Sequence, residues 1–206
     1  LQRLGLEHID ILFIHDADVF THGAEMQKVY FKQAMDGCYR ALLELREQGL
    51  VKAIGVGVNN WEVMLDFMRA GDFDTLLVAG RYTLLEQEAL NDLLPLCERR
   101  GTGIVIGGGF NGGILATGAV PGAKWNYAPA PEPIMQKVKK IEAVCARHKV
   151  PLPAAALQFL LAHPAVASHV PGTRNVEQMN QNIALVSHPI PPAFWQELKH
   201  EKLLRE

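Results

Sequence analysis

The stretch Ile9-Asp10-Ile11-Leu12-Phe13-Ile14-His15-Asp16 decides the fold class of this chain. Its apolar residues, mostly β-branched or aromatic, predict a fully buried strand rather than a half-exposed one. His15 and Asp16 then lie where the strand ends. In a parallel α/β barrel the catalytic residues lie at this end of the strands. The rest of the sequence must therefore supply further strands of the same kind if such a barrel is to form.

Buried-type strands and helices alternate along the whole chain. After the opening strand, strands are predicted at residues 52–58, 75–79, 103–106 and 166–170. Helical spacing predicts helices at residues 31–47, 61–70, 86–100 with a bend near Pro95, 134–148, 154–162, 176–186 and after Pro192. Residues 1–6 read as the end of a helix that Gly5 stops. Five βα units with no internal boundary predict a parallel sheet, and both an open Rossmann-like sheet and a (β/α)₈ barrel fit.

Composition narrows the class of function. The 206 residues are 49% hydrophobic and 20% charged, and 20 Lys+Arg against 22 Asp+Glu leave a net charge of -2, so bulk charge attracts neither nucleic acid nor an acidic membrane. No apolar run approaches the ~18 residues of a membrane span. The three cysteines form no CxxC pair or disulfide framework, which predicts buried thiols in a reducing compartment, the cytoplasm. No histidine spacing suggests a metal site.

A glycine-rich segment follows the strand at 103–106. Gly107-Gly-Gly-Phe-Asn-Gly112 formally matches GxGxxG, but residues 114–122 contain further glycines and a proline and do not predict the helix that this motif requires. No Gly-Lys-Ser/Thr follows, which excludes a P-loop. The glycines instead indicate close approach of the backbone to a flat ligand or a tight turn. Phe110 is expected either to stack on a ring there or to pack in the core.

Two other strand ends carry polar residues. Pro171-Gly172-Thr173-Arg174 leads into the helix at 176–186 and offers backbone donors, a hydroxyl and a guanidinium to a phosphate; a capped turn with a solvated arginine is the alternative. The side chains of Asn59 and Asn60 are able to hold a carboxamide group, or to act as turn formers and helix caps.

Four ordered segments resemble the aldo-keto reductase superfamily, in particular its branch of D-threo-aldose (L-fucose) dehydrogenases and pyridoxal 4-dehydrogenase-like enzymes. They are residues 5–16 (GLEHIDILFIHD), 53–61 (AIGVGVNNW), 79–87 (AGRYTLLEQ) and 170–175 (VPGTRN). The resemblance covers essentially the whole chain. It implies a (β/α)₈ TIM barrel of which residues 1–206 form one incomplete domain, the carboxyl-terminal portion with strands 4 to 8.

The resemblance also implies a function for the full-length enzyme, namely hydride exchange between a nicotinamide dinucleotide and an aldose, aldehyde or similar carbonyl or hemiacetal. His15 falls on the active-site histidine that orients the reacting oxygen. Asn59 and Asn60 match the pair that holds the nicotinamide carboxamide. The loop that clasps the pyrophosphate corresponds to Gly108, Phe110, Asn111 and Gly112, and the adenosine end to Gly172, Thr173, Arg174, Gln178 and Asn182.

Some positions depart from the family pattern. Gly107 occupies the place of a tyrosine that stacks on the nicotinamide, and Ala79-Gly80 the neighbourhood of a glutamine. Relatives that prefer NADPH carry a lysine and an arginine where this chain has Gly172 and Gln178, so between NAD and NADP the sequence favours NAD.

The family's tyrosine, lysine and aspartate match nothing in these residues, so the chain alone is expected to be inactive. The alternative is a non-catalytic nucleotide-binding module or regulatory subunit. The sequence does not predict the oligomeric state.

Overall fold

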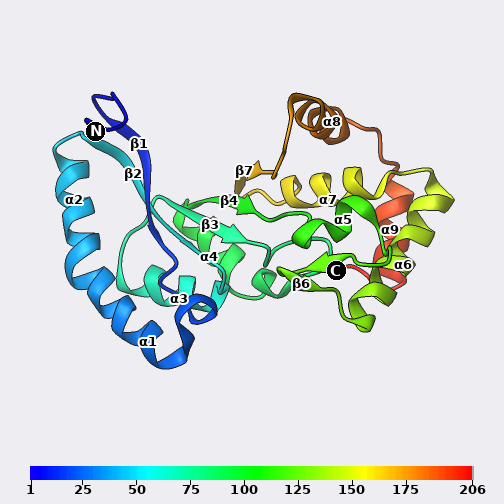
Figure 1. Cartoon of the computed structure of the whole chain (residues 1–206), viewed down its shortest axis with the longest axis horizontal. Helices are drawn as coiled ribbons and strands as arrows, with labels where there is room; N and C mark the ends of the chain where they lie inside the picture. The colour runs from blue at the N-terminus through cyan, green and yellow to red at the C-terminus, as the bar shows by residue number, and fades with distance from the viewer. Residues whose placement is uncertain (206) are drawn as a thin grey trace. The chain divides into compact units, whose positions relative to one another are not determined.

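The computed structural model describes residues 1–205, which divide into two compact units (Figure 1). The first unit comprises Leu1–Ala79 and Ala89–Val105, and the second comprises Gly80–Glu88 and the chain from Ile106 onward. Strand β4 (Gly103–Gly107) contributes residues to both units. The expectation of a single domain remains a prediction.

The first unit alternates strands and helices. In chain order its elements are β1 (Ile9–His15), α1 (Val19–Gln33), the π-helix η1 (Ala34–Tyr39), α2 (Arg40–Glu47), β2 (Val51–Val58), α3 (Trp61–Ala70), β3 (Thr75–Ala79), the 3₁₀ turn η2 (Glu88–Leu90), whose first residue belongs to the second unit, and α4 (Leu93–Arg100).

The second unit continues from the end of β4. Its elements are the 3₁₀ turn η3 (Asn111–Gly113), α5 (Ile114–Thr117), the hairpin strands β5 (Lys124–Trp125) and β6 (Ala128–Pro129), α6 (Glu132–His148), α7 (Leu152–Leu161), β7 (Val166–Val170), α8 (Val176–Val186) and α9 (Pro192–His200).

The parallel sheet has the strand order β1-β2-β3-β4-β7. The register pairs Ile9 with Val51 and His15 with Gly57, and then Gly55 with Thr75. Because the strands are parallel, the carboxyl ends of β1 and β2 lie at the same edge of the sheet. His15 and the residues that follow Val58 are thereby brought to one place.

Strand β1 is much less buried than its sequence predicts. Only Ile14 of this strand is buried, and Ile11 is 44% exposed, whereas Ile54, Val56 and Val58 of β2 are almost inaccessible. The expectation of a fully buried strand is therefore wrong for the described chain. The physical reason is the position of β1 at the edge of the sheet, where it has a strand on one side only.

The core of the first unit lies around β2. Helices α2 and α3 contact this strand, and α3 buries Met64 and Phe67 completely. Each such side chain contributes roughly 1.5–3 kcal/mol of hydrophobic stabilisation. Gly55 is required here, because a β-carbon on it would lie 2.6 Å from the Thr75 carbonyl oxygen and 2.7 Å from the Phe13 ring.

The second unit has a separate core. Helices α6, α7 and α9 bury a continuous cluster, whose fully buried members include Val138, Ile141, Val144, Ala155, Phe194 and Leu198. Phe110, from the loop after β4, and Trp125, from strand β5, pack against it.

Two helix predictions needed correction. Helix α1 precedes the predicted start at Phe31 by a dozen residues, and it buries none of its side chains, so no apolar periodicity marked it. The predicted helix at 86–100 begins only at Leu93, because Pro95 lies in the first turn, where a missing backbone N–H costs nothing. Residues 114–122 do contain a helix, α5, but it is only four residues long.

Residues 1–6 and Cys38 also bear on predictions from the sequence. Leu6 N–H donates to Leu1 O and Gly5 N–H to Gln2 O, with Gly5 at a φ of 64°, which is the bond pattern of a Schellman helix end. Residues 2–5 form turns and no helix, so the turn at Gly5 fits the predicted stop, whereas the helix before it stays a prediction. Cys38 is exposed, so the expectation that all three thiols are buried is wrong.

Candidate functional site

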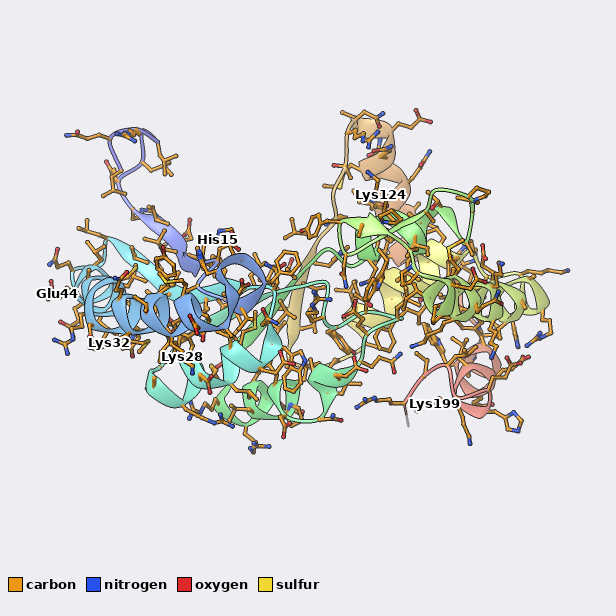
Figure 2. The ribbon with its side chains drawn as sticks, turned by 60° about the horizontal axis from the view of Figure 1, so that its bottom comes forward. His15, Lys28, Lys32, Glu44, Lys124 and Lys199 are labelled. Carbon is orange, nitrogen blue, oxygen red and sulfur yellow. The ribbon has the colours of Figure 1, made fainter. Side chains whose placement is uncertain are left out.

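His15 lies at the carboxyl end of β1 with a side chain that is 70% exposed (Figure 2). Its Nδ1 is 3.4 Å from Oδ2 of Asp16. Asp16 has a φ of 56°, a conformation that aspartate tolerates better than most residues, and its N–H donates to Gly57 O at 3.0 Å. The chain therefore turns sharply after the strand and leaves the imidazole accessible.

The neighbouring strand leaves room for this imidazole. A β-carbon on Gly57 would lie 3.4 Å from Cδ2 of His15, which places the ring directly over the glycine. A hollow of about 260 Å³ beside His15 is lined also by His22, Tyr30 and Cys38. The rings of His22 and Tyr30 are 4.2 Å apart.

Asn59 and Asn60 follow β2; Asn59 contacts the loop after β1, and Asn60 contacts the first turn of α1. The backbone N–H and the Nδ2 of Asn59 donate to Oδ2 of Asp18 at 2.5 and 3.1 Å. Oδ1 of Asn60 accepts from the Phe20 N–H at 2.9 Å. The two predicted asparagines are thus held against the segment that follows His15.

Asp18 is a buried polar residue that the sequence reasoning missed. It is 0% exposed, and its Oδ1 caps helix α1 by accepting from the Thr21 N–H at 2.8 Å. Burial alone raises the pKa of this carboxyl, but hydrogen bonds from Asn59 and Thr21 outweigh burial and hold the pKa below its ordinary value. The available signal was its position before a helix, as an N-cap.

The glycine segment after β4 lies in the second unit. Gly108 has a φ of 62°, and a β-carbon on it would lie 3.4 Å from the backbone nitrogen of Gly80. Gly112 has a φ of 75°, and a β-carbon on it would lie 3.1 Å from the carbonyl oxygen of Lys124. Both glycines are therefore needed for the path of the backbone. Phe110 packs against the core cluster, as one of the two expectations has it, and it also lines the cavity described below; stacking on a ligand ring stays a prediction.

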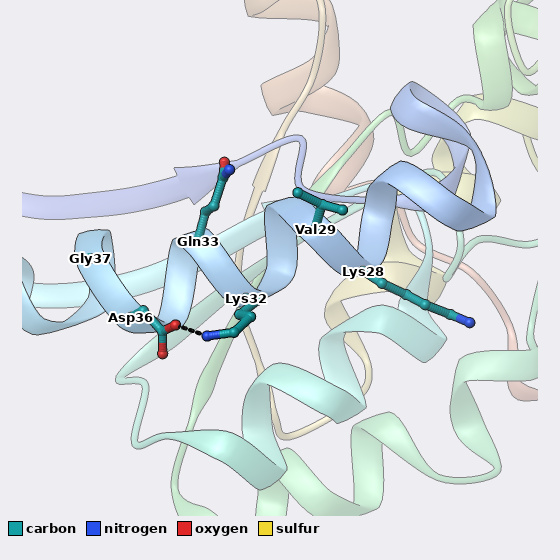
Figure 3. A pocket seen from close by; sticks show the side chains of 6 residues that line it. All are labelled: Lys28, Val29, Lys32, Gln33, Asp36 and Gly37. Atoms are coloured by element: carbon teal, nitrogen blue, oxygen red, sulfur yellow. Dashed lines mark hydrogen bonds and ion pairs between the residues drawn. The ribbon is translucent and has the colours of Figure 1, made fainter.

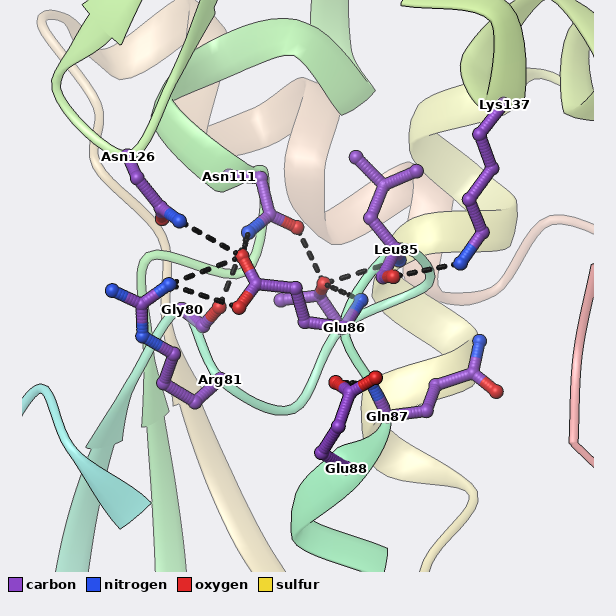
Figure 4. A network of polar contacts seen from close by, with 10 residues as sticks. Gly80, Arg81, Leu85, Glu86, Gln87, Glu88, Asn111, Asn126 and Lys137 are labelled. Atoms are coloured by element: carbon purple, nitrogen blue, oxygen red, sulfur yellow. Dashed lines mark hydrogen bonds and ion pairs between the residues drawn. The ribbon is translucent and has the colours of Figure 1, made fainter. Parts of the chain in front are cut away.

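Asn111 is 1% exposed, and its side chain is committed to internal bonds. Its Nδ2 donates to Gly80 O and to Oε1 of Glu86, both at 3.1 Å, and its Oδ1 accepts from the Thr83 hydroxyl (Figure 4). This side chain fixes the loop from within, and its predicted contact with a cofactor stays a prediction.

Glu86 is the centre of this network and was also missed by the sequence reasoning. Besides Asn111, its carboxylate accepts from Asn126 Nδ2 at 3.0 Å and from Arg81 Nη1 at 2.9 Å. The ion pair is largely buried, with side-chain exposures of 20% for Arg81 and 14% for Glu86. Lys137 Nζ donates to Leu85 O at 2.8 Å, which ties the same loop to α6.

A cavity of about 630 Å³ lies between the glycine segment and α8. The predicted cofactor-binding residues that line it are Phe110, Gly172, Thr173, Arg174, Gln178 and Asn182. Arg174 is the one charged residue among the described residues around it. The structure thus brings residues from two distant segments to a single concave surface.

The start of α8 is capped from both directions. Asn175 Oδ1 accepts from Gln178 N–H at 2.9 Å, and Gln178 Oε1 accepts from Arg174 N–H at 2.8 Å. This reciprocal arrangement resembles a capping box. It occupies two backbone donors that this turn would otherwise offer to a phosphate, so the turn is capped as the alternative expects, and phosphate binding stays a prediction.

A larger hollow lies elsewhere in the described residues. Its volume is about 670 Å³, and the residues of α1 and η1 line it (Figure 3): Lys28, Val29, Lys32, Gln33, Asp36 and Gly37. One helical segment alone forms this surface, and Lys32 is paired with Asp36. No polar groups converge there from a second element, so we assign it no role. Within residues 1–205, no helix is long and apolar enough to span a membrane.

The chain belongs to the aldo/keto reductase family, whose model matches residues 1–201. The predicted family is thereby confirmed, and the match extends over nearly the whole chain. It is 41% identical over 203 residues to a pyridoxal 4-dehydrogenase of Microbacterium luteolum and 37% identical over 204 residues to a D-threo-aldose 1-dehydrogenase of a Pseudomonas species. Each alignment covers 98% of this chain and 59% of the relative, so the chain spans about three fifths of their length.

A solved structure supports the fold. An aldo-keto reductase from Bacillus halodurans, in its holo form, superposes with a TM-score of 0.74 at 22% identity, covering 100% of this chain and 64% of that one. The α/β fold with a parallel sheet is therefore that of aldo-keto reductases, and the closed eight-stranded barrel remains a prediction.

Proposed function

We propose that this chain forms part of an oxidoreductase that exchanges a hydride between a nicotinamide dinucleotide and an aldose, aldehyde or similar carbonyl or hemiacetal. The observation that carries the proposal is the cavity in the second unit, where six predicted cofactor residues (Phe110, Gly172, Thr173, Arg174, Gln178 and Asn182) converge on a volume of about 630 Å³. Its size suits one end of a dinucleotide.

The cofactor supplies the hydride chemistry, and the protein orients it. In the second unit, Thr173 and Arg174 offer a hydroxyl and a guanidinium to phosphate or ribose oxygens, and Gln178 and Asn182 offer amides to the adenosine end. In the first unit, His15 is proposed to donate a hydrogen bond to the reacting oxygen. Oδ1 of Asn60 already accepts from Phe20, so its Nδ2 is the proposed donor to the nicotinamide carboxamide.

The proposed preference is for NAD. A 2′-phosphate needs cations, and Arg174 alone supplies one among the described residues that line the cavity. Gly172 offers a clean test, because nothing lies within 4 Å of a β-carbon built there and its φ is compatible with other residues. Gly172→Lys is expected to raise the affinity for 2′,5′-ADP about tenfold and to leave that for ADP unchanged.

The proposed activity is tested by binding and by turnover. Isothermal titration of the 206-residue chain with NAD⁺ and ADP-ribose measures the first, and NAD-dependent oxidation of L-fucose, D-arabinose and pyridoxal measures the second. We expect binding without appreciable turnover, because the family's tyrosine and lysine match nothing in these residues. Absence of binding to either nucleotide contradicts the proposed function.

Turnover also separates the enzyme from a nucleotide-binding module. A longer form of the protein that carries a tyrosine and lysine upstream of Leu1 is expected to oxidise one of these substrates. A longer form that binds NAD⁺ and oxidises none of them favours the non-catalytic module.

A further inference from the structure

A single carboxylate joins the ends of β1 and β2. Oδ1 of Asp18 accepts from the Thr21 N–H, whereas Oδ2 accepts both the backbone N–H and the Nδ2 of Asn59, 41 residues away in sequence. Asp18 is 0% exposed, so solvent does not compete for these bonds. The two oxygens thus have separate partners: one caps a helix, and the other holds the neighbouring strand end.

Two further hydrogen bonds lie on either side of the bonds between Asp18 and Asn59. The Phe20 N–H donates to Oδ1 of Asn60, and the Asp16 N–H donates to Gly57 O. The segment from Asp16 to the first turn of α1 is therefore attached to the end of β2 and the residues after it at three successive places. The amide of Asn59 faces Asp18, and that of Asn60 is oriented by Phe20.

The charge of Asp18 matters for this arrangement. An ionised carboxylate accepts at both oxygens, and hydrogen bonds to a charged acceptor are about twice as strong as neutral ones. An asparagine at this position could still cap α1 through Oδ1, but its NH₂ group would face the two Asn59 donors. A serine could also cap α1, and would leave the Asn59 donors without an acceptor.

We infer that Asp18 is a positioning residue, which holds Asn59 and Asn60 in the orientation that receives the nicotinamide end of the cofactor beside His15. This inference rests on the proposed function and deepens it. Asn59 then contributes by bonding to Asp18, and Asn60 presents its amide nitrogen to the ligand.

Binding of NAD⁺ and of ADP-ribose distinguishes a positioning role of Asp18 from a role in protein stability alone. ADP-ribose lacks the nicotinamide, so it reports on the cavity lined by Thr173 and Arg174 and not on the asparagines. We compare NAD⁺ and ADP-ribose binding by isothermal titration to the 206-residue chain and to Asp18→Asn and Asp18→Ser, both of which keep the helix cap. Asp10→Asn is the matched control, because this carboxylate of β1 is exposed and bonds only to groups remote from Asn59.

The expected result is a Kd for NAD⁺ about tenfold higher in both Asp18 variants, with a Kd for ADP-ribose within twofold of wild type. Asp10→Asn leaves both values unchanged. Equal changes for the two ligands, no change for either, or a wild type that binds NAD⁺ no better than ADP-ribose overturns the role of Asp18 while the proposed function stands.

Two further outcomes are decisive. A wild-type chain that binds neither ligand contradicts the proposed function itself, and the role of Asp18 with it. If circular dichroism shows that neither Asp18 variant folds although Asp10→Asn does, Asp18 is a structural residue and the inference is wrong.

Discussion

The imidazole of His15 lies against Gly57, so that a β-carbon on the glycine would be 3.4 Å from Cδ2 of the ring. The two residues are direct partners in the parallel register of β1 and β2. A contact this close is at the lower limit of ordinary van der Waals packing. The small residue on β2 therefore sets where the predicted catalytic histidine is able to lie.

Gly57→Ala is expected to displace the His15 ring while the fold persists. Because the side chain of His15 is largely exposed and able to rotate, the cost in unfolding free energy should stay under about 1 kcal/mol. The imidazole Cε1–Hε1 signal of His15 in a ¹H–¹³C spectrum should shift. Gly37→Ala is the control, because nothing lies within 4 Å of a β-carbon there. An unshifted His15 signal in Gly57→Ala speaks against the contact.

Glu86 is expected to stabilise the loops of the second unit. Glu86→Gln keeps the size of the side chain but leaves Arg81 without its carboxylate and turns an amide donor toward Asn111 or Asn126. For a largely buried pair we expect a loss of roughly 2–3 kcal/mol in unfolding free energy, measured by urea denaturation. The Kd for ADP-ribose should rise as well, because Phe110, next to Asn111, lines the cavity.

Glu88→Gln is the comparison for that measurement. Its carboxylate is 58% exposed and lies 3.6 Å from Arg205, so the change should cost under about 0.5 kcal/mol. Equal losses of unfolding free energy in Glu86→Gln and Glu88→Gln would show that the network around Glu86 stabilises the protein no more than the exposed pair of Glu88 does.

The sequence was sufficient for elements that carry clear spacing or boundary residues, whether they bury side chains, as α3 and β3 do, or bury none, as in β7 and α8. The predicted bounds of α3, β3, β7 and α8 match the structure, because apolar spacing and terminal residues such as Asn175 mark them. Helix α1 has no buried face and left no periodicity. The exposure of β1 depends on which strands lie beside it, and no local pattern reports that.

The site divides in the same way. Residues at strand ends, such as His15, Asn60 and Arg174, were predictable from motifs and from the resemblance to a family. Asp18 and Glu86 were not predictable, because their partners are distant in sequence. Asn59 lies 41 residues from Asp18, and Asn111 lies 25 residues from Glu86. Such contacts form only in the folded chain, so one sequence does not show them.

The three cysteines should differ in reactivity. Burial raises the pKa of Cys97 to about 12 and that of Cys145 to about 11. Desolvation also raises the pKa of Cys38, but this residue is exposed and accessible to a reagent. The thiolate is the reactive form, so a thiol reagent such as DTNB should modify about one thiol rapidly in the native protein at pH 8 and all three in guanidinium. Cys38→Ser should abolish the rapid phase. A rapid phase of three thiols in the native protein would contradict the burial of α4 and α6.

Asp18 should make stability depend on pH in the acid range. Its pKa in the folded protein is lowered below the ordinary 3.8, so its contribution is present above about pH 4 and is lost as the pH falls through the folded pKa. Asp18→Asn should therefore be less stable than wild type by about 1–3 kcal/mol at pH 7, and the gap should narrow toward pH 3. Urea denaturation at pH 7, 5, 4 and 3 measures it. Asp10→Asn should show a smaller gap throughout, because the exposed pair with Lys52 is screened by solvent. A gap for Asp18→Asn that stays constant from pH 7 to 3 would mean that folding does not change the pKa of Asp18, and that its bonds to Asn59 and Thr21 do not favour the charged carboxylate.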